Sequence, residues 1–204
     1  MTLKDWIAPG RTALLLIDIQ VDFASPQGAM GEDGKDMAAP QAAIGNAARL
    51  ADAARKAGVP CIFVRLITRA GDETPFLREW NARRHADDAP LCREGSEGAE
   101  FAGPKPQAGE LVFSKKRYNA FHGTGLDAAL RGEGIDTLVV AGLTTECCID
   151  SSVRAAFERD YHVFVVEDAT ACYQPELHQA ALRALALNCA ALAKTDDVLS
   201  AWNI

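Results

Sequence analysis

Runs of apolar residues recur along the chain and alternate with segments that have helical spacing. Residues 13–17, 111–113 and 137–141 form three such runs, and further apolar stretches lie at 61–64 and 163–166. Continuous apolar runs are typical of strands that are buried on both faces, as in a parallel sheet. We therefore predict five strands at these positions, and we expect the three runs named first to be buried on both faces.

The segments between these runs indicate amphipathic helices. Gly58 is expected to close the first helix, and Thr124 with Asp127 resembles a capping box before the second. Strands that alternate with helices indicate βαβ units. We expect an α/β fold in one domain over 1–204: a three-layer α/β/α, Rossmann-like arrangement with a central, mostly parallel sheet. The predicted helices cover about 41–56, 126 to 132 or 134, about 146–159 and about 175–187.

One long segment interrupts this alternation. Residues 68–109 are polar and rich in Gly and Pro, with Trp80 and Phe101 among the few large apolar side chains. Long insertions of this kind form lids over binding sites, parts of subunit interfaces or solvated excursions. The sequence leaves these alternatives open.

Composition limits the possible partners. The 204 residues are 49% hydrophobic and 24% charged, with a net charge of -7. Because no basic surface compensates for this charge, we expect neither nucleic acid nor an anionic membrane as a partner. No apolar run approaches the roughly 20 residues that span a bilayer. Residues 1–10 lack the apolar stretch of a secretory signal. We therefore expect a cytoplasmic protein.

The six cysteines do not indicate disulfides or a metal centre. They form no C-x-x-C pair and no cluster with zinc-ligand spacing. Cys61 opens an apolar strand and Cys189 lies in an apolar helix, so we expect both to be buried thiols. Asp18, Gln20 and Asp22 could suggest a cation site, but their spacing lacks the continuation of a calcium loop. We expect reduced cysteines, no metal and no cofactor.

Three apolar runs lead to residues that a hydrolytic site needs. The first stops at Asp18, the second is followed by Lys115, and the third ends at Gly142, six residues before Cys148. Ligands bind at the carboxyl ends of the strands in open parallel sheets. We therefore expect a carboxylate, an ammonium and a thiol to meet at one edge of the sheet.

The helical phase distinguishes the two adjacent cysteines. A helix start favours the thiolate and lowers a cysteine pKa. Cys147 falls on an outward-facing side, whereas Cys148 falls above Ser152 and Ala155, whose small side chains would leave room for a ligand. Spacing alone leaves a buried packing role for Cys148 equally open. The predicted apolar stripe comprises Ile149, Val153, Ala156 and Phe157.

Three segments together resemble the isochorismatase-like cysteine hydrolase family. Residues 15–23 (LLIDIQVDF) resemble its N-terminal signature, and 142–149 (GLTTECCI) resemble G-x-x-T-x-x-C-V. Residues 115–121 (KKRYNAF) resemble its lysine motif, K-x-x-x-S-A-F, except that Asn119 replaces the usual serine. The resemblance runs in order from about residue 11 to about residue 190, with weak cover between 68 and 105.

The resemblance implies a set of catalytic roles. Asp18 would take the thiol proton of Cys148, which would attack a carbonyl carbon and form a thioester. Lys115 would hold the carboxylate ionised and stabilise the thiolate. The backbone N–H groups of Thr144 and Cys148 would form an oxyanion hole. A cis peptide bond between Leu143 and Thr144 is also implied.

The resemblance also narrows the activity. Isochorismate hydrolysis does not need the cysteine position, so Cys148 favours an amidohydrolase that cleaves a small amide, ureido or carbamoyl compound. Residues 65–72 lack the histidines that form the metal site of nicotinamidases. An isochorismatase-type hydrolase of another small metabolite, a non-catalytic binding protein and a thiol-redox protein using Cys147 and Cys148 are the alternatives. The family further implies a homo-oligomer, a dimer or a tetramer.

Side chains near the predicted site are candidates for substrate binding. The candidate substrate-binding residues are Gln20, Phe23, Trp80, Phe121 and Tyr173.

Thiol reactivity would distinguish a catalytic Cys148 from a packing residue. A catalytic Cys148 is expected to react with iodoacetamide faster than Cys61 or Cys189 does.

Overall fold

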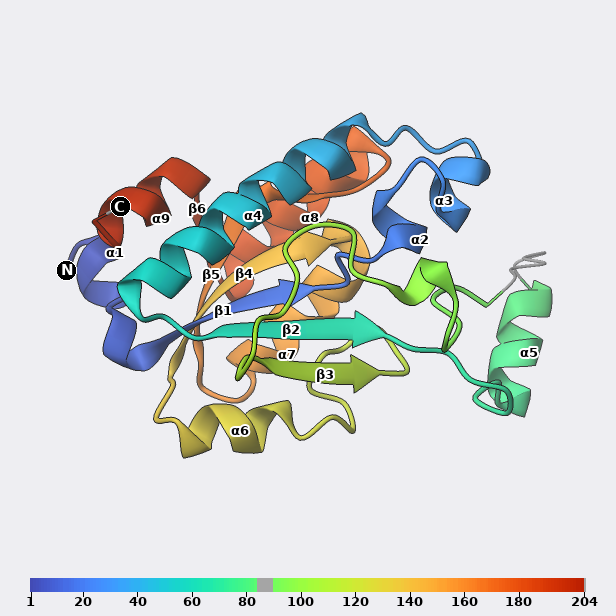
Figure 1. Ribbon diagram of the computed structural model, residues 1–204, viewed down its shortest axis with the longest axis horizontal. Coiled ribbons are helices and arrows are strands. Elements are labelled where there is room, and N and C mark those ends of the chain that lie inside the picture. Colours follow the sequence, from blue (N-terminus) through green and yellow to red (C-terminus); the bar gives the residue numbers. More distant parts are fainter. Residues whose placement is uncertain (84–89, 204) are drawn as a thin grey trace.

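A six-stranded parallel sheet forms the centre of the protein. The computed structural model describes residues 1–83 and 90–203. The strand order is β3-β2-β1-β4-β5-β6, and every neighbouring pair is parallel (Figure 1). This arrangement confirms the α/β fold. The strands are β1 (Thr12–Ile17), β2 (Cys61–Leu66), β3 (Leu111–Lys115), β4 (Thr137–Leu143), β5 (His162–Ala171) and β6 (Ala191–Ala193).

The two central strands are buried along their whole length. β1 reads TALLLI and β4 reads TLVVAGL, and every residue of both is buried. They pair in register from Thr12 opposite Thr137 to Ile17 opposite Gly142. Apolar side chains on both faces leave no position for water, which is why these strands lack polar alternation. Their carboxyl ends therefore share one level at one edge of the sheet.

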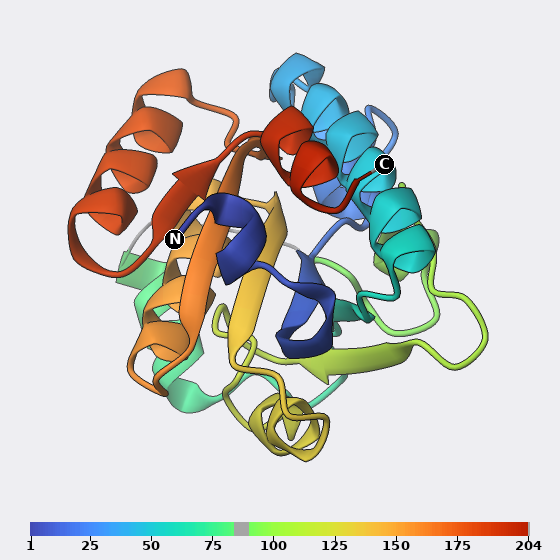
Figure 2. The ribbon, with the colours of Figure 1, turned by 90° about the vertical axis from the view of Figure 1, so that its left-hand side faces the viewer.

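Helices cover both faces of the sheet (Figure 2). Alternate residues of β1 point to opposite sides: Leu14 and Leu16 pack with α4 and α9, whereas Leu15 and Ile17 pack with α6, α7 and α8. Two apolar cores thus share one sheet. The helices are α1 (Leu3–Trp6), α4 (Ala38–Ala57) and α9 (Thr195–Ala201) on the first side, with α6 (Leu126–Gly132), α7 (Asp150–Phe157) and α8 (Pro175–Asn188) on the second.

Two predicted helix signals have different outcomes. Gly58 closes α4 with a left-handed φ of 71°, as predicted. The capping box before α6 is wrong: the helix starts after Gly125, and Thr124 Oγ1 accepts a 3.3 Å bond from the Leu126 N–H. Asp127 instead accepts a hydrogen bond from the Tyr161 hydroxyl at 2.8 Å. The Asp127 carboxylate, which the local pattern assigned to the capping box, is used in a tertiary contact instead.

The prediction that all three leading runs are buried is wrong for β3. This strand lies at the edge of the sheet, where Leu111 is 42% and Val112 39% exposed. Only Lys115, at its carboxyl end, is buried. A short apolar run therefore did not distinguish an edge strand from a central one.

Loops and short helices gather beside the carboxyl ends of the strands (Figure 1). Two of these helices, α2 (Val21–Ala24) and α3 (Ala29–Glu32), precede α4. The polar segment 68–109 contains α5 (Pro75–Arg83) and a 3-10 turn at Glu97–Ala99; residues 84–89 lie outside the described part. Cys92 and Ala99 of this segment form a small separate apolar cluster with Ile67, which precedes it.

No helix in the described part of the chain has the length and apolar character needed to cross a membrane.

Candidate active site

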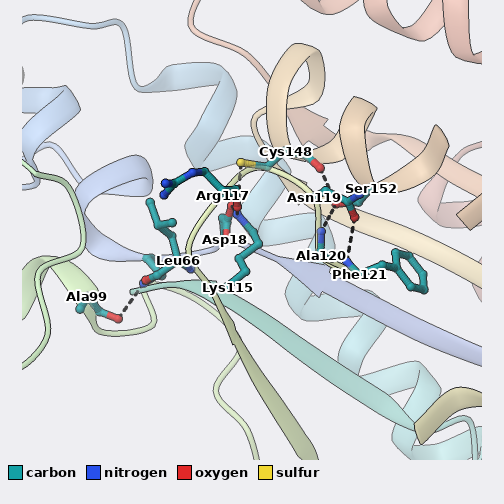
Figure 3. Close-up of polar contacts among 11 residues, drawn as sticks. Asp18, Leu66, Ala99, Lys115, Arg117, Asn119, Ala120, Phe121, Cys148 and Ser152 are labelled. Atoms are coloured by element: carbon teal, nitrogen blue, oxygen red, sulfur yellow. Dashed lines mark hydrogen bonds and ion pairs between the residues drawn. The ribbon is translucent and has the colours of Figure 1, made fainter. Parts of the chain in front are cut away.

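The three predicted reactive side chains meet at the carboxyl edge of the sheet (Figure 3). Lys115 Nζ lies 2.6 Å from Asp18 Oδ2 and 3.4 Å from Cys148 Sγ. All three residues are buried, with exposed fractions of 0% for Asp18, 1% for Lys115 and 7% for Cys148. The predicted convergence of carboxylate, ammonium and thiol is therefore confirmed.

Asp18 follows β1 directly and has an unusual backbone. Its φ is 53°, and its N–H still donates to the Val64 carbonyl of β2 at 2.8 Å. The neighbouring strand needs a glycine at this level, because a Cβ on Gly142 would lie 2.0 Å from the Ile17 carbonyl oxygen. Gly142 also has a φ of 129°, which side-chain-bearing residues rarely adopt. β4 thus approaches closely beside the residue that carries the carboxylate.

Lys115 reaches the site from the edge strand. β3 is separated from β1 by β2, so the two backbones are roughly 10 Å apart at the usual strand spacing. The long unbranched stem of lysine and the Asp18 side chain together bridge this distance, and the ammonium also donates to the Arg117 carbonyl at 3.0 Å. A shorter basic side chain at this position would not reach Asp18.

Cys148 lies in a turn of π-helix, not in the single helix predicted from the sequence. The turn covers Thr145–Ile149, and α7 follows it. The Thr144 carbonyl accepts the N–H groups of Cys147 and Ile149 at 3.1 and 3.2 Å. The N–H of Cys148, which the family resemblance assigns to the oxyanion hole, comes between these two N–H groups in the sequence. The peptide bond that joins Leu143 to Thr144 is cis.

Ser152 fixes the lysine motif to the cysteine turn. Its hydroxyl donates to the Cys148 carbonyl at 2.6 Å and accepts the Ala120 N–H at 3.0 Å (Figure 3). Ser152 is itself buried, and its hydroxyl is used in these two bonds. That its small side chain leaves room for a ligand beside Cys148 stays a prediction. Asn119, the departure from the family motif, accepts the Phe121 N–H at 2.8 Å and stabilises the local turn.

Burial and charge oppose each other at the ion pair. Burial raises the pKa of the Asp18 carboxyl above its ordinary value, and the Lys115 ammonium offsets this effect only in part. Burial lowers the pKa of Lys115, but the negative charge of Asp18, together with the interaction with Cys148, raises it by more. Lys115 therefore stays protonated, while Asp18 is a stronger proton acceptor than an exposed carboxylate.

The thiol of Cys148 differs from the expectation for a helix start. A hydrogen bond with Cys147, burial and the charge of Asp18 raise the pKa of Cys148 well above its ordinary value. The lowered pKa is found at Cys147, mainly through the same hydrogen bond. Cys148 thus rests as a thiol that needs a base. Cys61 and Cys189 are buried, as predicted.

Three candidate substrate-binding residues, Gln20, Phe23 and Tyr173, take part in hydrogen bonds that connect separate segments of the chain. Gln20 is buried, and its amide bonds to Leu66 on both its oxygen and nitrogen sides and to the Ala99 carbonyl, at 2.8–2.9 Å. Its side chain therefore connects β2 to the polar segment and presents no free amide group. Tyr173 donates to the Phe23 carbonyl at 2.8 Å, which ties the loop after β5 to α2.

The other two candidates have different surroundings. The Phe121 ring packs on Tyr161 and Arg159, which follow the far end of α7, and Figure 3 shows it directed away from Cys148. Its predicted place in the pocket wall is therefore not the one that the structure shows. Trp80 lies on α5 and is 44% exposed. Phe157 is 49% exposed, so it does not belong to the predicted apolar stripe.

Glu146 is a site residue that sequence reasoning missed. Its Oε1 accepts the Thr144 hydroxyl at 3.0 Å, and its Oε2 is buried without a hydrogen-bond partner among the described residues. Burial, followed by the charge of Glu146, raises the pKa of the nearby Tyr173. The signal in the sequence that could have identified Glu146 is its position, as a charged residue, inside the cysteine motif at 142–149. No cluster of three metal-ligating residues occurs within 1–83 or 90–203.

Comparison with known proteins assigns the family. The isochorismatase domain model matches residues 12–197. The chain belongs to the isochorismatase family. Ureidoacrylate amidohydrolase RutB of Methylobacterium radiotolerans is 35% identical over 187 residues, which cover 85% of this chain and 72% of the relative. The protein of the same name from Azorhizobium caulinodans is 32% identical and is 82% covered.

Solved structures of the family have the same fold. A cysteine hydrolase from Pseudomonas syringae pv. phaseolicola superimposes with a TM-score of 0.82 at 25% identity, over 97% of this chain and 95% of that one. N-carbamoylsarcosine amidase from Thermoplasma acidophilum gives a TM-score of 0.69 at 28% identity, over 91% and 97%. By these relationships the isochorismatase-family chain is a hydrolase of carbon–nitrogen bonds other than peptide bonds.

Proposed function

We propose that the protein is a cysteine-dependent amidohydrolase that cleaves a small ureido or carbamoyl compound through a thioester. One observation carries the mechanism: a single buried ammonium, Lys115, contacts both the Asp18 carboxylate and the Cys148 sulfur. This contact supports proton transfer from sulfur to carboxylate, because the cation stabilises the thiolate as it forms.

The first half of the reaction forms the covalent intermediate. Asp18 takes the proton of Cys148, and the sulfur lone pair forms a bond to the substrate carbonyl carbon. The carbonyl oxygen becomes an oxyanion, which the N–H groups of Thr144 and Cys148 stabilise. When the carbonyl bond reforms, the carbon–nitrogen bond breaks and Asp18 returns the proton to the departing nitrogen. The products are an amine or ammonia and a thioester at Cys148.

The second half regenerates the enzyme. Asp18 takes a proton from water, and the water oxygen attacks the thioester carbon. Collapse of this intermediate breaks the carbon–sulfur bond, and the proton on Asp18 passes to the leaving sulfur. The acid product leaves, and Cys148 is again a neutral thiol. One water is consumed for each carbon–nitrogen bond that is broken.

The names of the relatives support the substrate class. Ureidoacrylate and N-carbamoylsarcosine, the compounds in the names of two relatives, each carry a carbonyl group between two nitrogen substituents. We propose a small compound of this kind as the substrate.

Ammonia release from small amides, ureides and carbamoyl acids tests the proposal. Cys148→Ala should reduce kcat/KM on the order of 10³-fold or more, because the nucleophile is lost. Cys147→Ser is the matched control and should keep most of the activity, which also separates hydrolysis from redox chemistry at the cysteine pair. Activity that survives in Cys148→Ala would exclude the thioester mechanism.

A further inference from the structure

Arg117 lies in the lysine motif but takes no part in the proposed proton transfers. It follows Lys115 by two residues, and its carbonyl accepts the Lys115 ammonium at 3.0 Å. Burial alternates along this segment: Lys115 is buried, Lys116 is exposed and Arg117 is half-buried. Lys116 points outward and pairs with Asp72 at 2.5 Å. The backbone of Arg117 is therefore tied to the triad through Lys115, and its side chain is less exposed than that of Lys116.

The guanidinium of Arg117 has unused hydrogen-bonding capacity. Its Nη1 donates to the Lys116 carbonyl at 2.8 Å, and no carboxylate among the described residues lies within ion-pair distance. An arginine carries five N–H donors, so this bond leaves most of them available. In Figure 3 the side chain of Arg117 begins near the triad, and its guanidinium extends away from the Cys148 sulfur. Arginines that do pair with described carboxylates are Arg11, Arg49, Arg55, Arg69, Arg78, Arg131 and Arg154.

The charge of the site makes this cation significant. Asp18 already neutralises Lys115, and the whole chain carries a net charge of -7. An anionic substrate would therefore meet repulsion unless another cation faced it. A planar guanidinium can hold a carboxylate with two parallel hydrogen bonds, which fixes both position and orientation.

We propose that Arg117 binds a carboxylate group of the substrate and so restricts the enzyme to ureido or carbamoyl acids. This inference rests on the proposed amidohydrolase function. Because Arg117 and Lys115 belong to one tethered segment, a carboxylate at Arg117 places the other end of a short substrate toward Cys148. Arg117 is a specificity-determining residue that binds a group remote from the bond that breaks.

Two substrates of similar size test this role. N-carbamoylglycine carries the carboxylate, whereas 2-hydroxyethylurea is its neutral counterpart. Arg117→Gln should lower kcat/KM for N-carbamoylglycine roughly 10- to 100-fold, mainly through KM, as expected for a lost charge-assisted pair. The same variant should change kcat/KM for 2-hydroxyethylurea less than about threefold. Lys116→Gln, which removes the neighbouring outward charge, should leave both values nearly unchanged.

Binding without turnover keeps this inference separate from the proposed function. Calorimetry should detect N-carbamoylglycine binding to the Cys148→Ala variant and weaker or no binding when Arg117→Gln is added. Arg117→Lys, which keeps the charge, should restore part of the affinity. Equal losses on both substrates, or unchanged binding in the double variant, would overturn the role of Arg117. Failure of the wild type to release ammonia from any small amide would instead overturn the proposed function.

Discussion

At the scale of single residues, Lys115 has the most demanding environment. Its ammonium is buried at the end of an edge strand and contacts a carboxylate, a thiol and a carbonyl. Taking such a charge out of water is costly unless its partners compensate. The same contacts that stabilise the charge also connect the base to the nucleophile. Stability and chemistry therefore depend on the same side chain.

Removal of this ammonium should destabilise the protein. Lys115→Met keeps the apolar stem but leaves the buried Asp18 without its partner, so the free energy of unfolding should fall by about 3–5 kcal/mol. Urea unfolding at neutral pH measures this loss. The double variant Asp18→Asn with Lys115→Met should recover part of the stability but none of the activity. A loss below about 1 kcal/mol for Lys115→Met would show that the pair contributes little.

Protonation of Asp18 should limit the reaction at low pH. Burial raises the pKa of this carboxyl above its ordinary value of 3.8, and only the ionised form can take the thiol proton. kcat/KM should therefore rise with pH through an apparent pKa above 3.8 and fall as the carboxylate is protonated. Because Asp18, Lys115 and Cys148 are coupled, the measured value belongs to the group. An acid limb at or below 3.8 would contradict the buried environment of Asp18.

At the scale of elements, the close approach of β4 to β1 fixes the level at which the reactive groups meet. Gly142 permits this approach, and the π-turn after β4 then presents Cys148. Ser152 connects that turn to the loop after β3. Strand pairing, the turn and one buried hydroxyl together position groups that are far apart in the sequence.

Alanine substitutions at two glycines should have opposite effects. Gly142→Ala places a Cβ against the Ile17 carbonyl at a positive φ, so it should lower the free energy of unfolding by roughly 2–4 kcal/mol and reduce activity. Gly45→Ala is the matched control: it lies within α4 with open space around it and should stabilise the protein by about 0.5–1 kcal/mol. Thermal unfolding and kcat/KM compare the two. Equal effects at both sites would refute the steric argument.

Sequence patterns predicted the structural features that depend on hydrophobic periodicity and on the positions where strands end. Asp18, Lys115 and Cys148 could be brought together because the carboxyl ends of parallel strands share one edge. The pattern could not predict β6, because Ala191–Ala193 is too short to show a period, or α9 that follows it. The capping box failed because Asp127 bonds to a residue 34 positions away.

The remaining errors concern tertiary surroundings. Phe157 has the spacing of the core stripe but lies at the end of α7, where it is half-exposed. The amide of Gln20 is used by the backbone of Leu66 and Ala99, which only the folded chain brings near. The pKa of Cys148 is raised because burial and Asp18 outweigh the helix start. None of these surroundings is encoded in local spacing.

At the scale of the whole molecule, one sheet supports both apolar cores. Alternate residues of β1 and β4 contribute to the two sides, so neither core can form without the shared strands. The single domain predicted from the sequence should therefore unfold as one cooperative unit.

Matched core variants on the two sides test this cooperativity. Leu50, on α4, and Leu130, on α6, are both fully buried. Leu50→Ala and Leu130→Ala should each lower the free energy of unfolding by about 2–5 kcal/mol. Each should shift the whole urea transition, whether it is followed by circular dichroism or by tryptophan fluorescence. A variant that splits the transition into two steps would show that the layers unfold independently.

The burial of Cys148 has a practical consequence for counting catalytic centres. Cys147 is half-buried and has the lowered pKa, whereas the other five thiols are buried. A bulky aromatic disulfide reagent should therefore label the native enzyme at Cys147. The number of labelled thiols would then report a cysteine that catalysis does not need. The Cys147→Ser enzyme should take up almost no label and still turn over substrate; rapid labelling of that variant would mean that the nucleophile is open to large molecules.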